Sequence, residues 1–154
     1  MRKNHIAATA CVMGAFLGLA GAAQGIDGQA AYEQRRDTMK AMGRAFYLGI
    51  GRVVKGRAEY SAATVAAADS LPPLVAKIST LFPPGSDVAD SKMKPALLAA
   101  PDEVAKLASA VQAATPALVD AVKSGDRARI AAAYAKLNDA CSACHNDYRT
   151  EEDQ

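Results

Sequence analysis

The stretch Cys141-Ser142-Ala143-Cys144-His145 lies near the carboxyl end of this 154-residue chain. Cys-x-x-Cys-His is the attachment signature of a c-type haem. On a helix, residues three and four apart share one face, so the two thiols and the imidazole project to the same side. There Cys141 and Cys144 can form thioethers to a porphyrin, and His145 can bind the iron as its proximal ligand. The motif therefore predicts one covalently attached haem c.

Zinc binding and dithiol redox chemistry are two other uses of such a cluster. Structural zinc takes four protein ligands, whereas the chain has three Cys and two His, and Cys11 and His5 lie in a segment that we expect to be removed. A thioredoxin-like pair belongs beside a βαβ pattern, and no segment has strand character. A third class is a helical binding module without haem, such as a metal-storage or structural protein, which an absence of haem absorbance would support.

The amino-terminal residues 1–23 have the three parts of a secretory signal: basic Arg2 and Lys3, an apolar run, and small residues. We expect cleavage to leave a single domain of residues 24–154 in the periplasm, with no integral membrane span. Loss of Arg2 and Lys3 lowers the 18 basic residues to 16, which equals the 16 acidic residues. The near-neutral mature chain has no basic field for nucleic acid and no polybasic membrane patch.

Four segments have the apolar period of an amphipathic helix. They cover residues 27–54, 61–81 and 101–125, and the stretch from Asp126 through the haem motif. Aromatic residues make up only 5% of the chain and Trp is absent, which favours helices over a sheet. Short connections join the first segment to the second and the third to the fourth. We therefore expect an all-α antiparallel four-helix bundle with the haem near the carboxyl end of the last helix.

Local signals mark the ends of these helices. Pro101 stands at a first helical position with acidic residues behind it. Asp126 is a good N-cap for the last helix. Pro72-Pro73 predicts a break near Ser70.

The first helix contains Gly43, Gly49 and Gly51 in its second half. Each costs the helix roughly 1 kcal/mol relative to Ala. We expect close packing, with a flat macrocycle as the candidate partner, to hold this segment in place.

An exported four-helix chain with a haem motif on its last helix resembles the class II cytochromes c, the cytochrome c-prime family. The resemblance covers essentially the whole mature chain. Its strongest pieces are the stretch 141–149, Arg35 followed by Met39-Lys40-Ala41-Met42-Gly43-Arg44, and Val54-Lys55-Gly56 leading to Tyr60.

The resemblance implies that Met39 faces the iron opposite His145. In relatives of the low-spin cytochrome c-556 type a Met at this position ligates the iron, and where another apolar residue stands there the iron is five-coordinate. We expect ligation by Met39, with Met42 as the fallback, although a Met at helical spacing is also ordinary core filler. His/Met ligation suits one-electron transfer. The leading hypothesis is thus a periplasmic electron-transfer cytochrome with unidentified redox partner proteins.

The alternative is a five-coordinate haem protein that excludes dioxygen and binds nitric oxide or carbon monoxide, with Met39 as a steric gate. Enzymatic activity of the peroxidase type is not expected, because no distal histidine is available to move protons. The resemblance also implies haem attachment outside the cytoplasm. Relatives often pair through their first two helices, and the small residues 62–68 would permit close approach, so a homodimer is a further prediction.

Two arginines are candidate partners of the haem propionates. Arg149 follows His145 by four residues and Arg35 precedes Met39 by four, so each could lie beside its ligand and donate charge-assisted hydrogen bonds. An ordinary solvated arginine is the simpler interpretation of each. Tyr148 and Phe46 are candidates for packing on the porphyrin, which core packing also explains.

Overall fold

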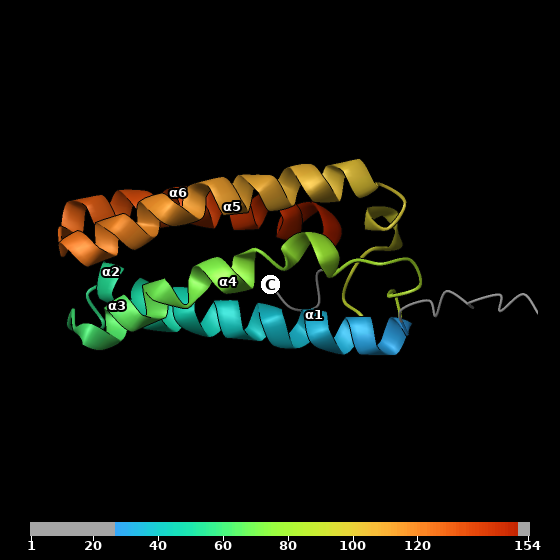
Figure 1. Cartoon of the computed structure of the whole chain (residues 1–154), viewed down its shortest axis with the longest axis horizontal. Helices are drawn as coiled ribbons and strands as arrows, with labels where there is room; N and C mark the ends of the chain where they lie inside the picture. The colour runs from blue at the N-terminus through green and yellow to red at the C-terminus, as the bar shows by residue number, and fades with distance from the viewer. Residues whose placement is uncertain (1–26, 151–154) are drawn as a thin grey trace, which may run out of the picture.

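The computed structural model describes residues 27–150, and these form a bundle with four arms (Figure 1). The prediction of an all-α four-helix bundle is confirmed. In chain order the principal elements are α1 (Gly28–Gly43), the π-helical turn η1 (Arg44–Ile50), α2 (Gly51–Val54), α3 (Ala62–Asp69), α4 (Leu71–Val75), α5 (Pro101–Ser124) and α6 (Arg127–Tyr148). Two short 3₁₀ turns, η2 (Ile78–Thr80) and η3 (Pro95–Leu97), lie in the connection between α4 and α5.

The first arm is α1 to α2, the second is α3 to α4, the third is α5 and the fourth is α6. Neighbouring arms run antiparallel and are joined by turns at both ends of the bundle. Figure 1 shows α5 and α6 side by side along one edge, with α3 and α4 running beside α1 along the other. The α2–α3 turn and the α5–α6 turn lie at the same end of the bundle. The long α4–α5 connection lies at the opposite end, beside the start of α1. This opposite end is also where the carboxyl half of α6 carries the haem motif.

The turn between α5 and α6 follows the predicted chemistry. Gly125 ends α5 in the left-handed region at φ 70°, which costs a glycine little because it has no Cβ. The Asp126 side chain then accepts hydrogen bonds from the backbone N–H groups of Ala128 at 2.9 Å and Arg129 at 3.0 Å. These two bonds satisfy donors that the first turn of α6 leaves without a helical partner.

The second arm breaks where the sequence predicts. The helix α3 ends at Asp69 and α4 begins at Leu71, with Ser70 between them. Pro72 and Pro73 fall in the first turn of α4, where a missing N–H leaves no helical hydrogen bond unmade.

The first arm differs from the uniform helix expected over residues 27–54. Its middle is a π-helical turn, in which the Gly51 N–H donates to the carbonyl of Phe46, five residues back. A Cβ on Gly49 would lie 2.5 Å from the Cβ of Ala67, and one on Gly51 would lie 2.6 Å from the hydroxyl oxygen of Tyr134. The expectation of a macrocycle as the packing partner is therefore wrong for these two glycines, which pack against α3 and α6.

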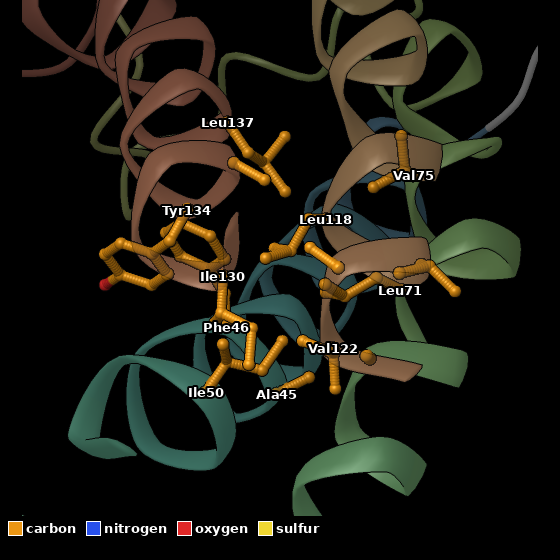
Figure 2. Close-up of a cluster of buried hydrophobic side chains, with 14 of the residues drawn as sticks. Ala45, Phe46, Ile50, Leu71, Val75, Leu118, Val122, Ile130, Tyr134 and Leu137 are labelled. Carbon is orange, nitrogen blue, oxygen red and sulfur yellow. The ribbon is translucent and has the colours of Figure 1, made fainter. Parts of the chain in front are cut away.

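The main core lies beside this π-helical turn (Figure 2). The ring of Phe46 stacks on that of Tyr134, with centroids 4.2 Å apart and ring planes 8° from parallel. Core packing thus accounts for Phe46, one of the two aromatic residues proposed for contact with the porphyrin. Side chains from every arm join the cluster: Ala45, Ile50, Leu71, Val75, Leu118, Val122, Ile130 and Leu137.

Among residues 27–150, no helix is both long and apolar enough to cross a membrane. The predicted signal segment, residues 1–23, lies outside the described residues.

The contact between Gly49 and Ala67 yields a test of the packing. Gly49→Ala should destabilise the protein by about 1–3 kcal/mol, because the added methyl overpacks the α3 contact. Ala67→Gly alone should cost about 1 kcal/mol through helix propensity. In the double variant the methyl has room, so the combined loss should be smaller than the sum of the single losses. Thermal unfolding of all four proteins measures this coupling, and strict additivity would contradict the contact.

Candidate functional site

The haem motif occupies the last turns of α6, and its three reactive side chains face one region. Cys141, Cys144 and His145 are each half-buried. Both thiols are free of disulfide bonds. All three line an internal cavity, as the three- and four-residue spacing of the motif predicts.

Two adjoining cavities meet at these residues. The inner cavity lies between α1, the π-helical turn, α5 and α6, and the outer cavity opens beside the α4–α5 connection. The outer cavity has a volume of about 530 Å³, within the range of roughly 300–1,000 Å³ typical of cofactor sites. The residues that line both cavities are Met39, Tyr47, Phe82, Leu97, Cys144 and His145.

The walls of the two cavities differ in polarity, as do the apolar body and the carboxylate edge of a haem. Apart from Tyr47 and the motif residues, the inner cavity is lined by hydrocarbon and thioether groups, including Met42, Val104 and Val111. The outer cavity is lined by five basic side chains and one acidic one: Arg35, Arg36, Lys40, Lys92, Arg149 and Asp90. An apolar macrocycle with two carboxylates would find matching surroundings in this pair of cavities.

Burial sets the protonation of the motif. It raises the pKa of the Cys141 thiol to about 11, with a smaller contribution from Cys144, and it also raises the pKa of Cys144. Burial lowers the pKa of His145, and the charge of Arg149 adds to this effect. The imidazole is therefore neutral near pH 7, which is the form that binds a metal ion.

The same residues fit a zinc ion less well. Among residues 27–150, no group of three or more Cys, His, Asp or Glu side chains is placed to hold a metal ion. A closed zinc site requires four protein ligands. The motif can supply three.

Met39 and Met42 differ in position. Met39 lines both cavities together with His145, whereas Met42 lines only the inner one. Of the two methionines, Met39 is thus the one at the junction where the motif residues meet.

The two predicted propionate partners lie in different settings. Arg149 lines the outer cavity and is half-buried. Arg35 is only 7% exposed, and its two terminal nitrogens donate four hydrogen bonds to Leu81, Ser86 and Ser91. The structure thus gives Arg35 a set of protein partners that sequence spacing did not predict.

Two site residues were missed from the sequence. Tyr47 reaches both cavities because the π-helical turn changes the face on which residues after Gly43 lie. Phe82 reaches them from the α4–α5 connection, which the sequence marks only as Pro- and Gly-rich loop. The apolar ring before two prolines was the one available signal for Phe82. No local signal identifies Tyr47.

Comparison with known proteins gives consistent matches. Residues 30–149 match the family described as Cytochrome C'. The cytochrome c' of Pararhodospirillum photometricum is 27% identical over 122 residues, which cover 79% of this chain and 97% of that protein. A ferrous arginine-to-lysine variant of cytochrome c prime from Alcaligenes xylosoxidans, with bound NO, superposes with a TM-score of 0.73 at 26% identity, covering 82% of this chain and 98% of that one. A carbon monoxide-bound leucine-to-glycine variant of the same protein gives a TM-score of 0.72 at 27% identity, with the same coverage.

These matches contradict the leading functional hypothesis. The prediction of an electron carrier with His145 and Met39 as axial ligands is wrong, because the relatives are cytochromes c' and several of the solved ones are described with bound NO or carbon monoxide. The physical reason is that a Met at helical spacing marks a position facing the cavity, and thioether ligation is only one use of such a position. The likeness to the cytochrome c-556 type is likewise not confirmed.

The predicted family and its haem c cofactor are confirmed. Proteins of the matched family carry a covalently bound haem c. The match spans residues 30–149, nearly all of the described residues, and includes the haem motif and the whole bundle. The chain belongs to the cytochrome c' family.

Proposed function

We propose that this protein binds nitric oxide or carbon monoxide at a five-coordinate haem c. In this proposal Cys141 and Cys144 hold the porphyrin by thioether bonds, and His145 is the protein's only ligand to the iron. When bound, the haem supplies an iron with one open position for a diatomic molecule. The proposal assigns the protein binding and no catalytic reaction.

The observation that carries the proposal is the apolar wall across the inner cavity from α6. On α1 and the π-helical turn this wall consists of Met39, Met42, Gly43 and Phe46, with Tyr47 at 44% exposure. Distal polarity and hydrogen-bond donors decide which ligand a haem accepts. Apart from the Tyr47 hydroxyl this wall is apolar, so it offers little stabilisation to the polar adduct of dioxygen, and uncharged NO and CO are favoured.

His145 is the natural proximal ligand because its environment favours the neutral ring. Arg149, one turn further on, is the better placed of the two arginines for a propionate, since it lines the outer cavity. Arg35 could reach a propionate only through Nε, because both terminal nitrogens already donate two hydrogen bonds each. Export to the periplasm and pairing through the first two predicted helices, residues 27–54 and 61–81, are retained as parts of the proposal.

Met39 provides the functional test. In the parent protein the ferric absorption spectrum should be that of a five-coordinate, high-spin haem, and Met39→Ala should leave it so. Truncating Met39 should raise the association rate of carbon monoxide with the ferrous protein by about tenfold, equivalent to about 1.4 kcal/mol of steric barrier. Met42→Ala is the comparison variant: Met42 belongs to the same wall but lines only the inner cavity, so its truncation should raise the rate less.

A low-spin parent spectrum that becomes high-spin in Met39→Ala would contradict the proposal. Such a result would show that the thioether occupies the iron. Equal carbon monoxide rates in the parent and both variants would remove the steric role of Met39.

The covalent attachment is tested with the motif cysteines. The mature protein from a host that makes c-type cytochromes should exceed its polypeptide mass by one haem, and acidified organic solvent should not extract that haem. The Cys141→Ala/Cys144→Ala double variant should release all its haem under the same treatment, since no thioether remains. Ser142→Ala, between the two cysteines, is the control and should behave as the parent. Complete extraction from the parent would refute the attachment.

The histidine gives a pH test. In the haem-free protein the pKa of His145 is depressed in the folded state and returns to about 6.5 on unfolding. Below that value the unfolded chain binds a proton that the folded protein does not, so stability should fall as the pH drops from about 7.5 to 5.5. The slope contributed by one proton is at most about 1.4 kcal/mol per pH unit.

Denaturant midpoints of the parent and His145→Met, both prepared without haem, measure the effect across this range. Their difference cancels the contributions of the other titrating groups. An identical pH slope in the two proteins would contradict a depressed pKa at His145.

A further inference from the structure

The side chain of Arg35 is the most completely buried charged group among residues 27–150. Nη1 donates to the carbonyl of Leu81 and to Oγ of Ser86, both at 3.0 Å. Nη2 donates to the carbonyl of Ser86 at 2.8 Å and to Oγ of Ser91 at 3.1 Å. The rings of Tyr32 and Phe82 lie 5.8 Å and 5.4 Å from the guanidinium carbon. All four bonds therefore end on one segment, which follows η2.

We call residues 81–94 the strap. Its turn also touches the start of α1, because a Cβ on Gly28 would collide with the carbonyl of Gly85. Ser86 is fully buried beneath this turn. The first half of the strap is thus fixed to α1 by a charged side chain and by backbone contact.

The second half of the strap is fixed to the end of α6. The Lys94 N–H donates to the carbonyl of Tyr148 at 2.8 Å, and the Thr150 N–H donates to the carbonyl of Lys92 at 2.9 Å. Met93 and Arg149 form an antiparallel bridge between these two bonds. Met93 also packs in a small apolar cluster with Leu97, Val104, Phe82, Leu98, Cys144 and Tyr148.

The strap therefore connects two helices across the mouth of the haem site. One end is held one helical turn before Met39, and the other is held beside the residues that follow His145. Phe82, Ser91 and Met93 of the strap line the outer cavity themselves. A buried cation with four directed bonds is costly to leave unpaired, so the strap and α1 are expected to move together.

We infer that Arg35 is a positioning residue, which fixes the strap and through it the carboxyl end of α6 at the haem site. This role differs from the propionate contact predicted from its spacing to Met39. It holds whichever ligand the iron takes.

Hydrogen exchange in the holoprotein tests the inference. The reporters are the amides of Lys94, at the end of the strap, and of Thr150, just after α6, which donate to the carbonyls of Tyr148 and Lys92 respectively. Arg35→Met should accelerate exchange at both by about tenfold or more, while amides in the middle of α5 keep their protection. Arg44→Met is the matched control, because Arg44 directly follows α1 but is exposed and lines neither cavity.

Two further variants make the test independent of how well Arg35→Met folds. Arg35→Lys keeps the charge but cannot serve four acceptors from one nitrogen, so it should accelerate the same amides. Ser86→Ala removes one acceptor and should act in the same direction by a smaller factor. Soret circular dichroism, which senses the surroundings of the haem, should change in the Arg35 variants and not in Arg44→Met.

Unchanged protection of Lys94 and Thr150 in all three variants would overturn the inference. Equal acceleration at the α5 amides would also overturn it, because Arg35 would then support the whole bundle and not the strap.

Discussion

The packing of the π-helical turn against α6 is the constraint on which the remaining structure depends. Phe46 stacks on Tyr134 at 4.2 Å, and Gly51 lies under the same tyrosine. Gly49 brings the turn equally close to α3. This end of the bundle can close only because two positions lack a side chain, and the main core forms around it (Figure 2). Closure here leaves the space for a cofactor to the other end.

At the open end of the bundle, the walls of the cavities become more polar from the core toward solvent. Apolar side chains line the inner cavity and basic ones line the outer cavity. His145 and Cys144 stand at the junction. A cofactor with an apolar body and an anionic edge is thereby oriented before any bond to it forms, because the reverse orientation would bury its charges among hydrocarbon.

The sequence predicts the fold well where local chemistry decides the outcome. The N-cap Asp126, the break at Ser70 and the αL residue Gly125 all follow rules that need no tertiary information. It predicts less where distant segments meet. Gly49 and Gly51 could be recognised as costly for a helix, but their partners Ala67 and Tyr134 are known only from the structure.

The haem motif and the hydrogen-bond partners of Arg35 show the same division between what the sequence predicts and what it does not. Cys141, Cys144 and His145 share a face because of helical spacing alone, and the structure places all three on the inner cavity. The hydrogen bonds of Arg35 run to residues 46 to 56 positions away. No periodicity encodes such pairs, so spacing favoured a propionate as the partner of Arg35.

The position of Met39 illustrates why a residue facing a haem need not bind it. A coordinate bond requires the sulfur to reach the iron, whereas a steric gate requires the side chain to be held short of it. The segment α1 is fixed on both sides of Met39: by Arg35 and the strap one turn before, and by Gly49 against Ala67 in the π-helical turn after it. A helix held at two points cannot shift toward the iron without breaking one of them. In the proposed function, the rigidity that keeps Met39 at a set height would also allow it to select small ligands, since a mobile side chain would give way to larger ones.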